Sequence, residues 1–234
     1  MDWDNQYSHD LLVGDAQGNI HIYLSTGTNP DSTPILDSGN TVQSGLVDID
    51  VGIRATPIVN DWDDDGRKDL LIGNYDGNVR IYLNEGTDSA PVFDTFSLLQ
   101  MGGTDFDIGT RAAPRIYDWN HDGLKDLLVG EVYGNIYYLE NVGTNVAPVF
   151  DSADMLLLNN GDPLKFDDGG NPAPRSRFFV ADWNEDGLDD IVVGGQNGQL
   201  ELYTTVVPEP VSSTLFIIGI ATLGFRRFRR KFKI

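Results

Sequence analysis

An all-β fold built from repeated sheets is predicted by three features of the sequence. A nine-residue acidic segment recurs along the chain, and each copy is followed by the same order of short apolar runs and glycines. Residues 1–206 show no helical periodicity. Glycine, at 26 of 234 residues, and an aromatic content of 10% are typical of short strands joined by tight turns.

The acidic segments divide the chain into four repeats. Three copies align without gaps, and a degenerate copy opens the chain; we number them loop 1 (2–10), loop 2 (61–69), loop 3 (118–126) and loop 4 (182–190). Every tryptophan of the chain stands at the second position of one of these loops: Trp3, Trp62, Trp119 and Trp183. Such regular placement indicates that each loop belongs to an equivalent structural unit.

The residues around each loop predict strands. An apolar stretch follows the loop and ends in a glycine, and a second glycine then precedes an alternating stretch, which is the pattern of a β-hairpin. These glycines are Gly14, Gly73, Gly130 and Gly194, and then Gly18, Gly77, Gly134 and Gly198. With one strand before the loop and one after the hairpin, a repeat of about 60 residues forms four antiparallel strands, as in a β-propeller blade. We expect about four blades in residues 1–206, the first without its opening strand and the last ending after its third strand at Tyr203.

Loops 2, 3 and 4 have the composition of a calcium site. Oxygen-bearing side chains occupy the first, third, fifth and ninth positions, and glycine occupies the sixth. Calcium takes six to eight oxygens, a backbone carbonyl at the seventh position usually adds one, and glycine permits the left-handed backbone of a sharp turn. The crowded carboxylates would repel one another without a cation. The alternative is a solvated acidic turn that binds no ion.

Other metal sites fit these loops less well. An EF-hand requires a glutamate at its twelfth position and flanking helices, whereas Ile72, Val129 and Val193 stand there and strands are predicted on both sides. Magnesium prefers a rigid octahedron and keeps its waters. The chain has no cysteine and three histidines, which disfavours zinc and copper.

With these loops and hairpins, the units resemble FG-GAP/VCBS repeats, the calcium-loop blades of integrin α-subunit heads and of many bacterial surface proteins. The resemblance covers residues 2–205 and implies a structural Ca²⁺ that braces the loop between the first two strands of each blade. The side-chain ligands it implies are Asp61, Asp63, Asp65 and Asp69; Asp118, Asn120, Asp122 and Asp126; and Asp182, Asn184, Asp186 and Asp190. The backbone ligands it implies are at Arg67, Leu124 and Leu188. Loop 1 departs from the pattern at Gln6 and Tyr7.

Residues 207–234 differ from the rest of the chain. Pro208, Glu209 and Pro210 are followed by a mostly apolar run, 211–225, and by a basic end. We expect this run to form a short hydrophobic helix, which would span about 22 Å, short of the roughly 30 Å hydrocarbon core of a membrane. The segment resembles the PEP-CTERM signal of exopolysaccharide-producing Gram-negative bacteria, which implies recognition and removal by an exosortase. The alternative is a permanent tail anchor with its basic end in the cytoplasm.

Charge and missing residue types exclude several functions. Residues 1–207 contain 35 acidic and 10 basic residues, so they would repel nucleic acid and attract cations. His9, His21 and His121 are the only histidines, and they form no nucleophile–base arrangement with another residue, so we expect no enzyme. The chain begins within an acidic loop and shows no signal peptide, so we expect upstream sequence that supplies one and more repeat.

Three sets of residues have both a structural and a binding interpretation. The tryptophans are expected to be packing wedges between blades, with sugar stacking as the alternative. Arg54, Arg111 and Arg175 each precede a loop by seven residues and would pair with an acidic loop or line a rim for an anionic glycan. Four tyrosines recur on the third strand and are expected in the core or at an edge: Tyr23, Tyr82, Tyr138 and Tyr203.

The sequence as a whole therefore predicts an exported, noncatalytic, calcium-binding surface or extracellular-matrix protein with an adhesion or scaffolding role. It would be anchored transiently in the membrane of a Gram-negative bacterium before an exosortase-type enzyme processes it. Exopolysaccharide and surface proteins are the candidate partners, and nucleic acid is not. The alternatives are a lectin-like propeller and a fragment of a polysaccharide-active enzyme.

Overall fold

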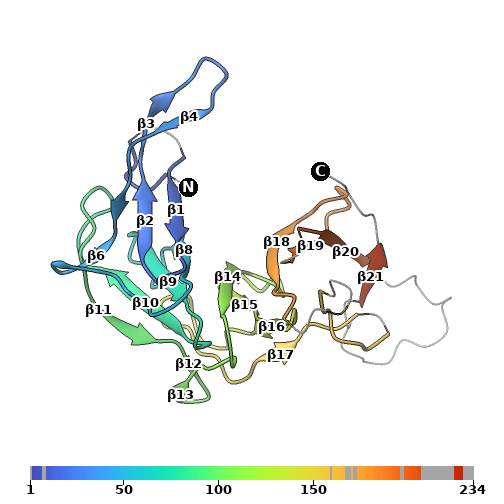
Figure 1. Ribbon diagram of the computed structural model, residues 1–234. Coiled ribbons are helices and arrows are strands. Elements are labelled where there is room, and N and C mark those ends of the chain that lie inside the picture. The colour runs from blue at the N-terminus through green and yellow to red at the C-terminus, as the bar shows by residue number, and fades with distance from the viewer. Residues whose placement is uncertain are drawn as a thin grey trace. The chain divides into compact units, whose positions relative to one another are not determined.

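The computed structural model describes residues 2–6, 9–158, 160–166, 170, 173–195, 198–206 and 224–228. These residues form an all-β structure that includes a curled, half-barrel sheet (Figure 1). They contain no helix of the length and apolarity that a membrane crossing requires. The chain separates into two compact units, unit 1 (Met1–Glu131 and Tyr138–Ala153) and unit 2 (Val132–Tyr137 and Asp154–Ile234). Loops 1, 2 and 3 belong to unit 1, and loop 4 belongs to unit 2.

Loops 2, 3 and 4 each join two antiparallel strands in the same register. The strand pairs are β8 (Thr56–Asn60) with β9 (Asp69–Gly73), β14 (Ala113–Tyr117) with β15 (Asp126–Gly130), and β18 (Arg177–Ala181) with β19 (Asp190–Gly194). The last residue of the first strand lies opposite the ninth-position aspartate in every pair: Asn60 opposite Asp69, Tyr117 opposite Asp126, and Ala181 opposite Asp190. The predicted order of strand, acidic loop and strand is confirmed.

Further strands extend the sheets of repeats 2 and 3. The sheet of repeat 2 has the order β7-β6-β11-β10-β9-β8, and that of repeat 3 has the order β14-β15-β16-β17. Their remaining strands are β6 (Gln43–Ser44), β7 (Val47–Asp48), β10 (Val79–Asn84), β11 (Phe93–Leu98), β16 (Ile136–Leu139) and β17 (Asp154–Met155). A separate pair, β12 (Gln100–Met101) and β13 (Thr104–Asp105), follows β11.

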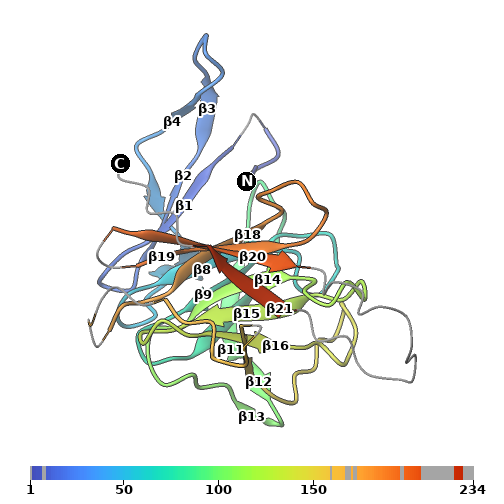
Figure 2. The ribbon, with the colours of Figure 1, turned by 90° about the vertical axis from the view of Figure 1, so that its right-hand side faces the viewer.

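Repeat 1 forms a three-stranded sheet of the order β1-β2-β5. Its strands are β1 (Leu11–Gly14), β2 (Ile20–Tyr23) and β5 (Asn40–Thr41). Between β2 and β5, the hairpin of β3 (Ser25–Thr28) and β4 (Pro34–Leu36) projects away from the β1–β2 pair (Figures 1 and 2). In the described residues this sheet has one strand fewer than the four of repeat 3, as the sequence predicts.

The sheet of repeat 4 differs from the prediction at its last strand. The sequence predicts that this repeat stops after its third strand at Tyr203. Instead β20 (Leu200–Val206) continues to Val206 and pairs with a fourth strand, β21 (Gly224–Phe228), from Leu202 opposite Phe228 to Val206 opposite Gly224. Gly224 and Phe225, the end of the predicted helix, thus lie in a strand. Residues 211–223 and the motif Pro208, Glu209 and Pro210 lie outside the described residues.

The second strands of repeats 2 and 3 form the centre of the core of unit 1. Every residue of β9 and β15 is buried, and the apolar side chains of both strands are fully buried: Leu70, Leu71, Ile72, Leu127, Leu128 and Val129. A strand that is apolar on both faces must be covered on both faces. This explains why the stretches after the loops read as continuous apolar runs rather than as alternating ones.

Two of the four tryptophans are packed against an aromatic residue of the following repeat. Trp3 lies 6.3 Å from Phe93 and Trp62 lies 6.2 Å from Phe150, measured between ring centroids, and both tryptophans are about 95% buried, with 5% and 6% exposed. These contacts agree with the interpretation of Trp3 and Trp62 as packing wedges. Trp183 in loop 4 is 57% exposed.

The difference in burial predicts unequal effects of the same substitution. Trp62→Phe should lower the free energy of unfolding by about 1–2 kcal/mol, because the smaller ring leaves part of the contact with Phe150 unfilled. Trp183→Phe, at an exposed position, should change it by less than about 0.5 kcal/mol. Urea denaturation of the two variants measures this difference, and equal effects would contradict the assignment of Trp62 as a wedge.

Candidate metal centre

Loops 2, 3 and 4 share one hydrogen-bond framework. The first aspartate of each loop accepts hydrogen bonds from the backbone amides of the fifth and sixth residues: Asp61 from Asp65 and Gly66, Asp118 from Asp122 and Gly123, and Asp182 from Asp186 and Gly187, at 2.9–3.0 Å. The carboxylate of the aspartate at the fifth position accepts a hydrogen bond from the backbone amide of the residue at the seventh position, which is Arg67, Leu124 or Leu188. The loops therefore fold alike although their sequences differ.

Two positions of each loop have a left-handed backbone. The sixth-position glycines have φ of 84–87°, as the sequence predicts. The fourth position is also left-handed, with φ of 57–59°, at Asp64, His121 and Glu185. Sequence reasoning missed this second turn because three different residue types, and no glycine, stand at the fourth position, and a left-handed backbone costs about 1–2 kcal/mol for an ordinary residue.

The aspartate at the ninth position of the loop links the loop to the sheet in all four repeats. One oxygen of its carboxylate accepts a hydrogen bond from the backbone amide of the loop tryptophan. The other oxygen accepts a hydrogen bond from a backbone amide fifteen residues downstream. The downstream donors are Ser25 to Asp10, Asn84 to Asp69, Asn141 to Asp126, and Thr205 to Asp190. Burial raises the pKa of Asp69, Asp126 and Asp190 above its usual range, although these hydrogen bonds oppose the rise.

Loop 2 brings three of its predicted ligands together. Carboxylate oxygens of Asp61, Asp63 and Asp65 lie within 4.8 Å of one another; Asp69 does not belong to this group. Oδ1 of Asp63 is buried and has no hydrogen-bond partner among the described residues. An unpartnered buried carboxylate oxygen is costly, and a cation at this place would remove the cost. The donor set, all oxygen, fits calcium.

In loops 3 and 4 the third position holds an asparagine whose side-chain amide is hydrogen-bonded. Asn120 and Asn184 stand where loop 2 has Asp63, and each donates to the fifth aspartate, at 3.0 Å to Asp122 and 2.9 Å to Asp186. Each asparagine oxygen also accepts that aspartate's backbone amide, at 3.0 Å. A neutral third residue thus lowers the repulsion between carboxylates and still offers an oxygen to a cation.

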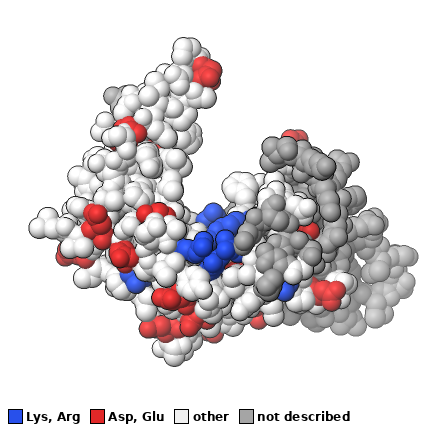
Figure 3. All heavy atoms as spheres, in the orientation of Figure 1, with Lys and Arg blue, Asp and Glu red and all other residues white. Residues whose placement is uncertain are grey.

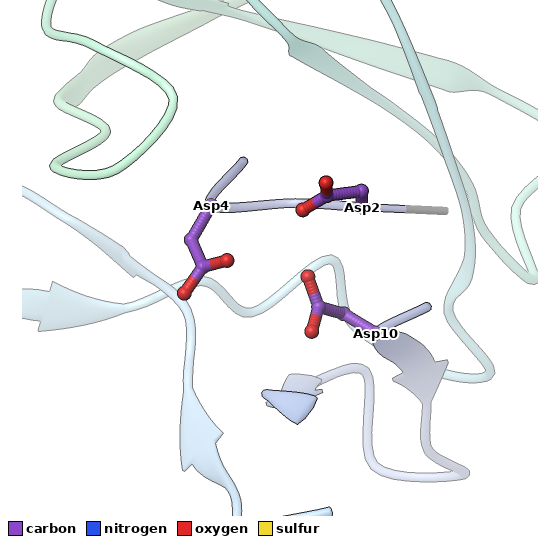
Figure 4. A group of neighbouring side chains, drawn as sticks. All are labelled: Asp2, Asp4 and Asp10. Atoms are coloured by element: carbon purple, nitrogen blue, oxygen red, sulfur yellow. The ribbon is translucent and has the colours of Figure 1, made fainter. Parts of the chain in front are cut away.

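Loop 1 gathers carboxylates despite its degenerate sequence. Asp2, Asp4 and Asp10 place carboxylate oxygens within 4.8 Å of one another, and Figure 4 shows the three side chains turned toward a common space. Gln6 stands at the fifth position and donates its backbone amide to Asp4 at 3.1 Å. The carboxylates that loop 1 brings together are those of its first, third and ninth positions, whereas loop 2 brings together those of its first, third and fifth positions.

The positively charged side chain of Arg67 contacts a residue that is predicted to bind calcium. Its guanidinium pairs with the carboxylate of Asp65, and its side chain is 41% exposed. Leucine stands at this position in loops 3 and 4, as Leu124 and Leu188. A cation that binds Asp65 must therefore compete with Arg67 in loop 2 alone.

This competition predicts that Arg67→Leu tightens calcium binding by loop 2. We expect about a threefold gain in affinity, because an exposed ion pair contributes at most about 1 kcal/mol. The amide signal of Gly66 in an NMR calcium titration measures occupancy of this loop, because that amide donates to Asp61. Leu124→Met in loop 3 is the control and should leave Gly66 unchanged. An unchanged or weakened affinity in Arg67→Leu would refute the competition.

The three arginines that precede the loops share an unusual backbone. Arg54, Arg111 and Arg175 have φ of 59°, 62° and 63°, and their amides donate to carbonyls at Ala16, Tyr75 and Val132. The guanidinium of Arg111 lies 5.3 Å from the centroid of the Tyr75 ring. The recurring feature is therefore a backbone turn at the entry of the first strand. Both side-chain interpretations of these arginines stay predictions.

Figure 3 shows carboxylates scattered over one face of the molecule, together with a patch of lysine and arginine side chains. The tyrosines of the third strands lie where the sequence predicts, with Tyr82 and Tyr203 buried in the core. The Tyr138 hydroxyl donates to Asp126 at 3.1 Å, and burial raises the pKa of this tyrosine.

Comparison with known proteins adds one finding. A family described as FG-GAP-like repeat matches residues 61–129, which begin with loop 2 and include loop 3. No curated protein matches the chain. An FG-GAP-like repeat is therefore present in the part of the chain where two complete acidic loops follow each other.

Proposed function

We propose that the chain is a calcium-stabilised β-propeller segment of a noncatalytic surface or extracellular-matrix protein, with a role in adhesion or scaffolding. The observation that carries this proposal is the carboxylate group of loop 2 with its unpartnered Asp63 oxygen, on a framework that recurs in loops 3 and 4. The FG-GAP-like repeat at residues 61–129 supports a surface or adhesion-type propeller.

The side chains at the first, third and fifth loop positions would hold the ion, with the seventh carbonyl and the ninth aspartate as further ligands. Bound calcium supplies positive charge that offsets the repulsion between these carboxylates. The chain itself supplies the geometry: the left-handed turns place the carboxylates, and the buried ninth aspartate joins the loop to its sheet.

Equilibrium dialysis of the purified chain against buffer of low ionic strength with about 5 mM calcium, followed by elemental analysis on both sides of the membrane, tests calcium binding, because sites with dissociation constants of about 0.1–1 mM lose their ions in calcium-free buffer. We expect about three bound calcium ions per chain, one for each of loops 2, 3 and 4, and replacement by magnesium to be poor. A chain that binds less than one calcium ion, and shows no binding in a calcium titration, would contradict the proposal.

We also propose export and processing at Pro208, Glu209 and Pro210 by an exosortase-type enzyme, on the strength of the sequence alone. Mass spectrometry of protein extracted from the cell surface of the native host should find no peptide from residues 215–225. The intact tail in the membrane fraction of a host with active exosortase would favour a tail anchor.

One observation favours the lectin-like alternative. Trp183 is 57% exposed beside the carboxylates of loop 4, and an exposed indole is a suitable platform for a sugar ring. A glycan array with the chain in calcium, repeated with Trp183→Ala, separates the two functions. Glycan binding that disappears in the variant would support a lectin. No glycan binding by either protein would favour the scaffolding role over the lectin.

A further inference from the structure

The eighth residue of loops 2 and 3 is a lysine that reaches the preceding loop. The Lys68 ammonium lies 3.4 Å from the carbonyl oxygen of Trp3 and 2.7 Å from Oδ1 of Asn5 in loop 1. The Lys125 ammonium lies 3.3 Å from the carbonyl oxygen of Trp62 and also contacts the Asp61 carbonyl and the Asp64 carboxylate in loop 2. The same contact thus occurs twice between consecutive repeats of unit 1.

Both lysines are held at their backbone as well. The Lys68 amide donates to Oδ1 of Asp88 at 2.8 Å, and the Lys125 amide donates to Oδ1 of Asn145 at 2.7 Å. The Lys68 ammonium also pairs with Asp88 at 2.8 Å. The two lysine side chains are only 24% and 17% exposed. Each lysine therefore links two loops with little freedom at either end.

The place of the lysine within its own loop gives this link a direction. The eighth position lies between the seventh residue, whose carbonyl is a predicted ligand, and the ninth aspartate, which is buried against the sheet. A cation in one loop would fix the backbone on both sides of the lysine. The ammonium would then hold the second and fourth residues of the preceding loop, and the Lys125 ammonium would hold the first residue as well.

We propose that Lys125 couples calcium binding in loop 3 to loop 2, and that Lys68 couples loop 2 to loop 1 in the same way. This inference rests on the proposed calcium function. Ordering a lysine side chain and its backbone costs conformational entropy. When an ion already occupies the loop that contains the lysine, the lysine is ordered, so binding in the preceding loop no longer has to order it. Occupancy of loop 3 therefore strengthens binding in loop 2. The lysines are positioning residues, because they act through the loop and are not ligands.

Loop 4 provides a natural comparison within the chain. Its eighth residue is Asp189, so it has no lysine that could act on loop 3 in this way. We therefore expect the affinity of loop 3 to be independent of the state of loop 4.

The test is a double-mutant cycle followed by NMR. The amides of Gly66, Gly123 and Gly187 each donate to the first aspartate of their own loop, so their signals measure the occupancy of loops 2, 3 and 4 separately. Asp122→Ala disables loop 3, and the calcium affinity of loop 2 is then compared with and without Lys125→Met. Lys165→Met, at an exposed lysine outside the loops, is the matched control.

Disabling loop 3 should weaken loop 2 about fivefold when Lys125 is present, which lies within the usual range of coupling between sites. In the Lys125→Met background the effect should fall below about twofold, and with Lys165→Met it should stay near fivefold. Disabling loop 4 by Asp186→Ala should leave loop 3 unchanged. If Lys125→Met does not fold, Lys125→Gln replaces it, because glutamine is one bond too short to reach the carbonyls.

The outcomes separate this inference from the proposed function. Glycine signals that do not respond to millimolar calcium would overturn the calcium proposal and, with it, the coupling. Normal responses with no weakening of loop 2, or with the same weakening in Lys125→Met, would overturn the coupling alone.

Discussion

Removal of calcium is expected to lower the melting temperature of the protein by roughly 10–20 °C. Extracellular calcium modules bind with dissociation constants of about 0.1–1 mM, so at roughly 2 mM calcium a site at the tight end stabilises the fold by about 1.8 kcal/mol. Three such sites together contribute about 5 kcal/mol, which is comparable to the whole stability of many domains. Thermal denaturation in calcium and in excess chelator measures the difference.

Single substitutions should show how much each loop contributes to the calcium-dependent rise in melting temperature. Asp65→Ala should reduce the calcium-dependent gain in melting temperature by about a third and should cost more affinity than Asn120→Ala, because it removes a carboxylate rather than a neutral amide. We expect loop 2, with four carboxylates among its ligands, to fill first, and loop 1 to fill last or not at all. Asp76→Ala, an exposed aspartate outside the loops, is the control. A melting curve that chelator does not move would count against structural calcium.

The strands and the loops could be predicted from the sequence because both leave a local signal. The acidic pattern, the glycine of the turn and the apolar run after it are all determined within about twenty residues. The second strand of each pair begins at the last aspartate of its loop, Asp69, Asp126 or Asp190, where the predicted apolar stretch starts. The local sequence therefore determines the strand–loop–strand unit of each repeat.

The partners of the loop residues could not be predicted, because they lie far apart in the chain. Lys68 contacts Asn5, 63 residues away, and Lys125 contacts Asp64, 61 residues away. The ninth aspartates were predicted as ligands, whereas their burial and their two amide donors appear only in the structure. The lysine at the eighth position of both loop 2 and loop 3 is a sequence signal from which this link could have been predicted.

The last strand of repeat 4 shows how composition can hide a strand. Residues 224–228 belong to a segment whose apolar run and basic end predict a helical sorting signal, and its pattern offers no alternation to suggest a sheet. In the structure these residues pair with β20 over five positions. Backbone pairing with an available edge requires no particular side-chain pattern, so the sequence contains little trace of it.

Gly14 and Gly73, which follow loops 1 and 2 at the end of a strand, have a role that periodicity alone does not explain. A Cβ atom on Gly14 would lie 2.3 Å from the carbonyl oxygen of Ala55, and one on Gly73 would lie 2.2 Å from that of Ala112. The Cδ atoms of Pro57 and Pro114 would also be close to these Cβ atoms, at 2.7 Å and 2.6 Å. The glycine is therefore needed where one repeat packs against the first strand of the next, and the proline of that strand fills the space beside it.

Gly73→Ala is accordingly expected to lower the free energy of unfolding by about 3 kcal/mol, because the added methyl group meets backbone that cannot turn aside. The matched control is Gly194→Ala at the equivalent place in repeat 4, where the nearest atom is the flexible end of the Leu200 side chain at 3.1 Å. The control should cost less than about 1 kcal/mol. Urea denaturation in calcium compares the two variants. Equal losses would mean that the tight packing of Gly73 against Ala112 does not determine how repeats 2 and 3 fit together.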